Sequence, residues 1–254
     1  MPTNFNFLNK EIWGTVVTFQ APRELTENLS FQSACESAFE FFKEIDRLFS
    51  TFRSDSQISK IRTGEMEISE ADDLVKIIWN KSLSLRELTM RAFDPWAVPG
   101  GFDPSGIVKG WAIQEALKFF ADRNIDHVQI NAGGDLVIRG GVSANDPWVI
   151  GIQHPDLPDQ IAKSYELFDG AIASSGTYER GAHIIDPRVG VPAVGARAAT
   201  VIGPDAAVAD ALATALIVDG RDSVNWLGQA EFRNYSFWAV DKFGDGAWSY
   251  VNPS

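Results

Sequence analysis

The chain has 254 residues, of which 45% are hydrophobic and 22% charged, and this composition favours a soluble globular protein with a substantial core over a fibrous or disordered one. Acidic residues outnumber basic ones by 34 to 22, and the resulting net charge of −12 argues against nucleic acid as a partner. A phosphate-bearing ligand would have to be held by backbone amides, a metal ion or a few well-placed basic side chains, because the general field repels anions.

Hydrophobic periodicity predicts mixed helices and strands. In the first half of the chain, we expect a strand over Glu11–Phe19, helices over Leu29–Phe49 and Glu70–Thr89, and a helix from about Ser105 or Gly106 to Asp122. Strands should follow over Val128–Asn131, Leu136–Arg139, Trp148–Gln153, Ala171–Ser174 and Ala199–Ile202. A nearly all-apolar helix should begin after Pro204 and end at Gly220, and SFWAV and AWSYV should form a final antiparallel pair. This order predicts an α+β (mixed α/β) fold, with residues 1–254 forming a single large domain that could have two lobes.

The N-terminal sequence MPTNFNFLNKEIWGTV has no basic n-region and no long apolar run. We therefore expect no signal peptide, no lipoprotein signal, no membrane insertion and a cytoplasmic location. The single cysteine, Cys35, excludes an intramolecular disulfide and lies among apolar residues at helical spacing, where we expect it to serve packing.

Asp210 and Thr214 are the only polar side chains of the segment Ala209–Leu216, and they share one helix face because they are four residues apart. A carboxylate and a hydroxyl at this spacing offer two hard oxygen ligands that suit Mg²⁺. In the alternative, Thr214 bonds back to the carbonyl of residue 210 and Asp210 acts as a cap. The spacing alone favours this alternative.

The segment DPSGIVKGW (Asp103–Trp111) places a proline and a serine before a helix whose first amides are unpaired, and such a terminus attracts anions. Lys109, one turn into the helix, could direct a positive charge toward a phosphate or a flavin carbonyl. In the alternative, an ordinary capped helix carries a solvated lysine. The segment is neither a Walker motif nor a Rossmann glycine fingerprint.

Two further segments are candidates for a site. NAGGD (Asn131–Asp135), between two predicted strands, is either a hairpin turn or a place where the backbone approaches a ligand. His183 is followed closely by an aspartate and an arginine, and it could act as a general base because the unperturbed pKa of histidine is about 6.5. His127 and His154 are predicted to be structural.

Several segments occur together in a fixed order: WGT, FSTFRSDSQIS, AFDP, DPSGIVKGWA, NAGGD, IASSGTYER, HIIDPRVGVP and ADALATAL. In this order they resemble the flavin transferases of the ApbE type, which move FMN from FAD to a Ser or Thr hydroxyl of a target protein. The resemblance extends over about residues 13–220, most of the chain.

The resemblance implies roles for individual residues. Asp210 and Thr214 fall on the family's metal-ligand pair, and the backbone carbonyl of Gly106 completes the protein's share of the Mg²⁺ shell. His183 matches the histidine that takes the proton from the acceptor hydroxyl. The positions that match flavin-contacting or cavity-lining ones are Phe52, Ala92, Phe93, Asp94, Lys109, Ser175, Gly176 and Tyr178.

The chain also departs from the family pattern. Family members commonly carry a long insert between the FDP loop and the DxxGxxKG helix, whereas only Trp96–Phe102 separate the two motifs here. Thr177 stands where an acid is common. The compact FDP loop and the segment DPSGIVKGWA resemble a cytoplasmic subgroup within the family.

The implied activity is that of an Mg²⁺-dependent FAD:protein FMN transferase, in which a Ser/Thr hydroxyl of a target flavoprotein displaces AMP from FAD. Three alternatives stay open at this point. They are an Mg²⁺-dependent FAD pyrophosphatase that yields FMN and AMP, a non-catalytic FAD-binding protein, and an interaction protein with a vestigial site.

Overall fold

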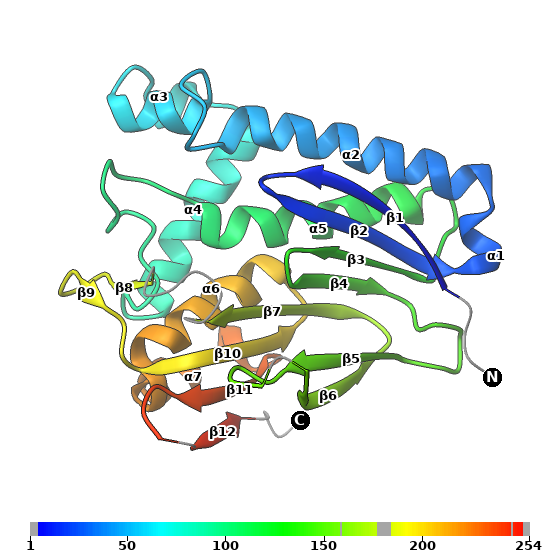
Figure 1. The fold of residues 1–254 in the computed structure, drawn as a ribbon. Coiled ribbons are helices and arrows are strands. Elements are labelled where there is room, and N and C mark those ends of the chain that lie inside the picture. Colours follow the sequence, from blue (N-terminus) through cyan, green and yellow to red (C-terminus); the bar gives the residue numbers. More distant parts are fainter. Residues whose placement is uncertain (1–4, 158, 177–183, 245, 251–254) are drawn as a thin grey trace.

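The computed structural model describes residues 5–157, 159–176, 184–244 and 246–250, which fold around one large sheet (Figure 1). The sheet has eight strands in the order β1-β2-β3-β4-β7-β10-β11-β12, and each neighbouring pair is antiparallel. These strands are β1 (Phe5–Ile12), β2 (Thr15–Pro22), β3 (Val128–Ala132), β4 (Asp135–Arg139), β7 (Gly170–Gly176), β10 (Ala196–Gly203), β11 (Ser236–Asp241) and β12 (Ala247–Tyr250). Separate hairpins are formed by β5 (Trp148–Gln153) with β6 (Ile161–Leu167), and by β8 (Ile185–Asp186) with β9 (Val191–Pro192).

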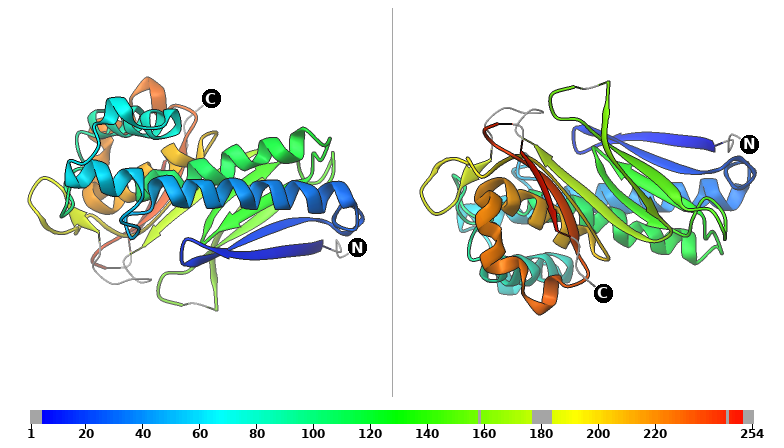
Figure 2. Two further views of the ribbon diagram at one scale, coloured as in Figure 1. Left: turned by 90° about the horizontal axis from the view of Figure 1, so that it is seen from above. Right: turned by 90° about the horizontal axis from the view of Figure 1, so that it is seen from below.

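Helices cover one face of this sheet (Figure 1, Figure 2). The α-helices are α1 (Arg23–Thr26), α2 (Leu29–Phe49), α3 (Gln57–Thr63), α4 (Asp73–Leu88), α5 (Ser105–Ala121), α6 (Ala206–Asp219) and α7 (Val224–Leu227), and the short 3₁₀ helices are η1 (Ile68–Glu70), η2 (Gly220–Ser223) and η3 (Ala230–Phe232). Helix α5 lies on β3 and β4, α6 lies on β7 and β10, and α2 packs on α5. This arrangement confirms the predicted α+β class.

The main core lies between the sheet and its helices. Phe19 on β2 packs against Phe42 of α2 and Phe120 of α5, with ring centroids 6.1 and 5.9 Å apart. A smaller apolar cluster on the other face of the sheet joins β4, β5 and β7 through Leu136, Ile152 and Ile172. The sheet is therefore covered by helices on one face and by the β5–β6 hairpin on part of the other.

Helix α6 is buried on almost every side, as its nearly all-apolar sequence predicts. Its small residues allow α5 to approach closely, because a Cβ atom at Gly110 would lie only 2.7 Å from the carbonyl oxygen of Ala206. Asp205 caps α6 by accepting a hydrogen bond from the backbone N–H of Val208. The structure thus holds α5 and α6 in backbone contact directly under the sheet.

The prediction of one strand over residues 11–19 was wrong. Trp13 and Gly14 have φ angles of 56° and 68°, so the chain turns back there and forms the β1–β2 hairpin. Most residues of β1 are exposed or half-buried, and its sequence therefore lacks a clear apolar alternation.

Helix α3 was not predicted. Its N-cap is Ser56, whose hydroxyl accepts a hydrogen bond from the N–H of Ser59, and its C-cap is Gly64 in the left-handed conformation. Only Ile58 of this short helix is buried, so the apolar periodicity is too weak to reveal it. Among the described residues, no helix has both the length and the apolar character needed to cross a membrane.

Candidate functional site

Four structural elements bring polar side chains together above helix α6. Asp210 and Thr214 stand on α6, Lys109 on α5, Asp135 at the start of β4 and Ser175 near the end of β7. The Lys109 ammonium lies 2.6 Å from Oδ2 of Asp135, and the hydroxyls of Ser175 and Thr214 are 3.3 Å apart. The predicted residues Lys109, Ser175, Asp210 and Thr214 are therefore neighbours in space.

Two carboxylates of this group are deeply buried, because Asp135 is 2% exposed and Asp210 8% exposed. Burial raises the pKa of Asp135, and Lys109 opposes this effect. Burial also raises the pKa of Asp210 well above its ordinary value, and the charge of Asp135 raises it further while Lys109 lowers it. One ammonium thus faces two carboxylates that water barely reaches.

The surroundings of Asp210 fit a divalent cation. Among the described residues, Oδ2 of Asp210 has no hydrogen-bond partner, and a buried anion without a partner is costly. The described residues contain no group of three or more His, Cys, Asp and Glu side chains that could hold a metal. Carboxylate and hydroxyl oxygens suit Mg²⁺, which commonly takes only one or two carboxylates from a protein.

Gly106 lies in the first turn of α5, where Phe93 packs against it. A Cβ atom at residue 106 would lie 3.0 Å from Cε2 of the Phe93 ring. The predicted residues Phe93 and Gly106 are therefore in contact, and a side chain at residue 106 would push the ring away.

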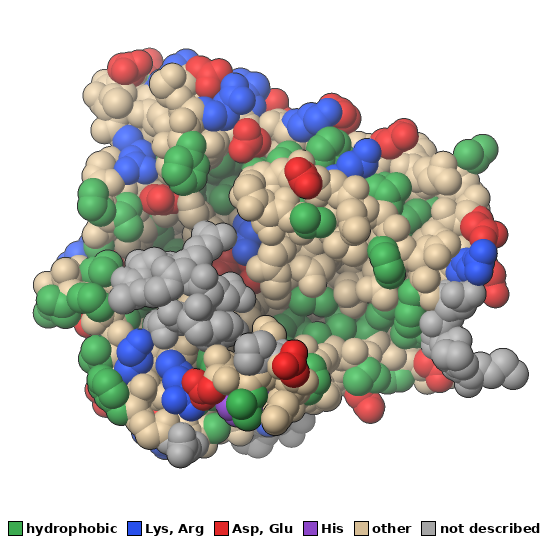
Figure 3. All heavy atoms as spheres, viewed as in Figure 1, with side chains coloured by type: hydrophobic (Ala, Val, Ile, Leu, Met, Phe, Trp, Pro, Cys, Tyr) green, Lys and Arg blue, Asp and Glu red, His purple; other side chains and the backbone are tan. Residues whose placement is uncertain are grey.

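A cavity of about 500 Å³ adjoins this group of side chains. It lies between the β1–β2 turn, the end of α2, the start of α5 and the β3–β4 turn, and its lining includes Trp13, Thr15, Phe49, Phe52, Ser105 and Lys109. This volume is in the range of small-molecule and cofactor sites. In Figure 3, basic and acidic side chains lie at the bottom of a hollow in the middle of the visible face. Lys109 belongs both to the cavity lining and to the ion pair with Asp135.

Phe52 is placed as an exposed residue at the cavity, with 98% of its surface open to solvent. A ligand could cover this ring and remove a large apolar surface from water.

Ser175 and Gly176 end strand β7, where they pair with Ala199 and Ala198 of β10. Tyr178 and His183, predicted to contact the cofactor and to act as the base, lie outside the described residues.

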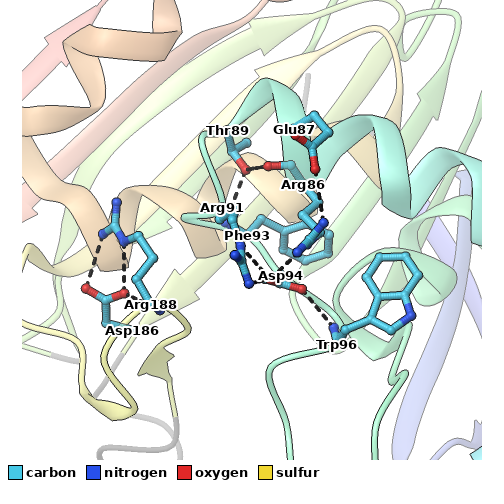
Figure 4. A network of polar contacts seen from close by, with 9 residues as sticks. All are labelled: Arg86, Glu87, Thr89, Arg91, Phe93, Asp94, Trp96, Asp186 and Arg188. Atoms are coloured by element: carbon cyan, nitrogen blue, oxygen red, sulfur yellow. Dashed lines mark hydrogen bonds and ion pairs between the residues drawn. The ribbon is translucent and has the colours of Figure 1, made fainter.

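The Ala92–Asp94 loop is buried beside the site rather than in the described cavity lining. Figure 4 shows that Asp94 is the centre of its polar contacts. Its Oδ2 accepts hydrogen bonds from Nε of Arg86 at 2.9 Å and Nη2 of Arg91 at 3.0 Å, and its Oδ1 accepts one from the N–H of Trp96 at 3.0 Å. These contacts fix the loop that presses Phe93 onto Gly106.

A second ion-pair group in the same view fixes the β8–β9 hairpin (Figure 4). Arg188 donates hydrogen bonds to both carboxylate oxygens of Asp186, at 3.0 and 3.1 Å, and it also pairs with Asp219 at the end of α6. Burial alone would raise the pKa of Asp186, but hydrogen bonds from Arg188 outweigh it and lower that pKa. The hairpin is thus tied to the helix that carries Asp210.

Asp135 was not among the predicted site residues. The β3–β4 turn was considered only as a hairpin or as a close approach of backbone, although the strand that Asp135 begins is almost entirely buried. Gly133 and Gly134 have φ angles of 60° and 98°, which glycine adopts readily. An acid that opens an apolar strand directly after two glycines is the signal that could have identified it.

Known proteins of one family match this chain in sequence and in fold. Residues 99–235 match the model of the ApbE family. The chain is 30% identical over 163 residues to an FAD:protein FMN transferase of Vibrio cholerae, an alignment that covers 60% of this chain and 48% of the relative. It is 30% identical over 155 residues to one of Haemophilus influenzae, covering 57% and 44%. The chain therefore spans about half the length of the relatives it matches.

Solved structures extend the likeness to nearly the whole fold. The ApbE protein of Thermotoga maritima superimposes with a TM-score of 0.83 and 26% identity, covering 96% of each chain. The flavin transferase ApbE of Vibrio cholerae does so with a TM-score of 0.83 and 21% identity, covering 99% of this chain and 98% of the other. The fold is that of the ApbE class. This chain belongs to the ApbE family.

The polar contacts of Asp94 lead to a prediction about acid stability. Burial by itself would raise the pKa of Asp94, but hydrogen bonds from Arg86, Trp96 and Arg91 outweigh it and lower the pKa. The unfolded chain therefore binds a proton more readily than the folded one, so the stabilisation is present above the ordinary Asp pKa of about 3.9 and is lost as the pH falls below it. Asp94→Asn should flatten this acid limb, measured by urea unfolding from about pH 5 to about pH 2.

Asp55→Asn is the matched control, since it removes a carboxylate that pairs with Arg53 on the surface. Exposed pairs contribute little to stability, so its acid limb should stay close to that of the unmodified chain. An equal acid dependence in Asp94→Asn and the unmodified chain would contradict the assignment.

Proposed function

We propose that this protein is an FAD:protein FMN transferase, which moves FMN from FAD to a Ser or Thr hydroxyl of a target flavoprotein and releases AMP. The observation that carries the proposal is a cavity of about 500 Å³ whose lining includes the Lys109 ammonium, which belongs to the same polar group as the buried Asp210 carboxylate and the Thr214 hydroxyl. The names of the relatives and their shared fold support it.

The cavity is the proposed binding site for FAD. Its aromatic residues Trp13, Phe49 and Phe52 offer surfaces for the flat rings of FAD. Lys109 contributes the positive charge that a pyrophosphate needs in a chain with a net charge of −12. Phosphoryl transfer depends mainly on positioning and charge neutralisation, so such a cavity can supply much of the catalysis.

Asp210, Thr214 and the carbonyl of Gly106 are proposed to hold Mg²⁺. The unpartnered, buried Oδ2 of Asp210 is the structural feature that favours this. A bound Mg²⁺ would supply electrostatic stabilisation of the charge on the pyrophosphate oxygens. Thr214 is oriented in part by the hydroxyl of Ser175, so strand β7 takes part in shaping the site.

The covalent step is a displacement at the FMN-side phosphorus of FAD. The bond from the acceptor hydroxyl oxygen to phosphorus forms, the bond from phosphorus to the AMP oxygen breaks, and the hydroxyl proton passes to His183. This role of His183 follows from the family resemblance, and the residue lies outside the described part of the chain.

The activity itself is tested by incubating the purified protein with FAD and Mg²⁺, with and without a flavin-acceptor domain. We expect a fluorescent acceptor in a denaturing gel and an equal amount of AMP. AMP and free FMN in both tubes would instead establish a pyrophosphatase. No AMP in either tube, with FAD bound in stoichiometric amount, would leave a binding protein.

The metal assignment predicts the effect of Asp210→Asn. Because a bound divalent cation is worth several kcal/mol of transition-state stabilisation, transfer should fall by roughly 100-fold or more. The fold should hold, since the change removes a buried charge that has no hydrogen-bond partner at Oδ2 among the described residues. Rates of AMP release across an Mg²⁺ titration, together with urea unfolding, measure both effects. Asp222→Asn, an exposed acid beyond α6, is the control and should keep the normal rate.

The proposed base predicts a separation of binding from chemistry in His183→Ala. FAD affinity should stay within about twofold of normal while transfer falls by about 10²–10⁴-fold, the usual contribution of a general base. Flavin fluorescence titration measures the first and acceptor labelling the second. His154→Ala is the matched control, because that ring accepts a hydrogen bond from the N–H of Asp156 in a surface turn. Normal transfer by His183→Ala would remove this residue from the scheme.

A further inference from the structure

The charges around Asp210 are not balanced within the described residues of the site. Lys109 faces two carboxylates, Asp135 and Asp210, both of which are nearly excluded from water. Charge interactions are strong where water is excluded. The carboxylate that pairs with the Lys109 ammonium is therefore neutralised, and the other carboxylate keeps a negative charge that can bind a cation.

The ammonium is held by Asp135. Nζ of Lys109 lies 2.6 Å from Oδ2 of Asp135 and forms an ion pair with this carboxylate. Lys109 acts on Asp210 through its charge, which lowers the pKa of that carboxyl. The pairing is therefore unequal, although both acids belong to the same buried group.

The backbone explains why Asp135 can hold this position. The β3–β4 turn is fixed by a hydrogen bond from the N–H of Gly134 to Oδ1 of Asn131 at 3.1 Å. Gly133 lies so close to Thr15 that a Cβ atom there would be 2.8 Å from the threonine hydroxyl oxygen. Asp135 also accepts a hydrogen bond from the backbone of Ser174 in β7. The carboxylate is thus anchored by the sheet rather than by the helices.

The backbone also brings Lys109 near the helix that carries Asp210. Lys109 stands next to Gly110, the residue at which α5 touches the start of α6, and Asp210 lies one turn further along α6. A long lysine side chain at this contact has the reach and flexibility to pair with an acid on α6. Asp135 on β4 is the group that draws it elsewhere.

We propose that Asp135 is a positioning residue, which holds the Lys109 ammonium and thereby keeps the Asp210 carboxylate available to a divalent cation. This inference rests on the cation site proposed above. It assigns to the aspartate of NAGGD a role through Lys109, not through contact with the metal. Without Asp135, the ammonium would turn to Asp210 and the group would lose its net negative charge.

The test measures cation affinity directly, with Mn²⁺ as the probe and electron paramagnetic resonance to follow the free ion. Asp135→Asn keeps the size of the side chain and removes its charge. We expect Mn²⁺ affinity to fall by roughly 10- to 100-fold, the range found when a group that orients a metal ligand is removed. Asp126→Asn, in the exposed pair with Arg139 at the other end of the same hairpin, should bind Mn²⁺ normally.

A double-mutant cycle with Lys109→Met separates positioning from a direct role. If Asp135 acts through Lys109, Asp135→Asn should weaken Mn²⁺ binding much less when residue 109 is methionine. An equal loss in both backgrounds would mean that Asp135 acts on the ion itself and would overturn the proposal. Lys109→Met alone should keep or raise Mn²⁺ affinity, and a fall would contradict the proposal even if Asp135→Asn does not fold.

Mn²⁺ binding distinguishes failure of the cation site from failure of the positioning role of Asp135. Saturable Mn²⁺ binding that Asp210→Asn abolishes and Asp135→Asn leaves intact would keep the cation site and overturn the positioning role. Absence of saturable Mn²⁺ binding in the unmodified protein would overturn the cation site and, with it, the role of Asp135.

Discussion

The close contact between helices α5 and α6 is the constraint on which the rest of the site depends. Gly110 permits the contact, because any larger residue would collide with the backbone of Ala206. Gln114 then fastens it, since its side-chain oxygen accepts a hydrogen bond from the N–H of Ala206 at 2.6 Å and its nitrogen donates one to the carbonyl of Pro204 at 3.0 Å. The oxygen and the nitrogen of the Gln114 amide therefore both fix the start of α6. The position of this start determines where the residues of α6 lie.

This contact leaves Asp210 in surroundings that are unfavourable to a lone charge. Helix α6 is packed between α5 and the strands β7 and β10, so water cannot solvate the carboxylate as it would on the surface. Proteins tolerate such local costs mainly where function requires them. The same burial that makes Asp210 expensive also strengthens its attraction for a cation, because few water dipoles screen it.

The parts of the site that are local in sequence were predictable. Asp210 and Thr214 stand out because they interrupt an otherwise apolar helix at a spacing of one turn, and the structure places Lys109 and Ser175 beside them. Contacts between distant segments were not predictable in this way. The sequence near Lys109 does not predict its ion pair with Asp135, because that pair depends on how β4 is placed against α5.

The same distinction applies to the fold. The long helices and the final strand pair were predicted because burial of one face leaves a regular apolar pattern. Strand β1 and helix α3 bury few residues, and their ends depend on turns and caps rather than on periodicity. The motif that contains Asp94 was recognised in the sequence, but its hydrogen bond with Arg86 was not predicted, because Arg86 lies on a separate helix, α4.

The segment between Asp94 and α5 serves the site by fixing where α5 begins. Trp79, Trp96 and Phe102 form an aromatic cluster with centroids 4.6 to 5.0 Å apart, which folds the segment back onto α4. Arg62 of α3 donates hydrogen bonds to the carbonyls of Pro99 and Gly100, at 2.5 and 3.0 Å.

These contacts bring the two ends of the segment together, and the N–H of Asp103 donates to the carbonyl of Pro95 at 2.9 Å. Asp103 in turn accepts a hydrogen bond from the N–H of Ser105, the first residue of α5. The segment therefore fixes the start of the helix that carries Gly106 and Lys109. The aromatic side chains of the segment, Trp96 and Phe102, pack against Trp79 of α4 and are not in the described lining of the cavity. Phe52, by contrast, lines the cavity and is exposed.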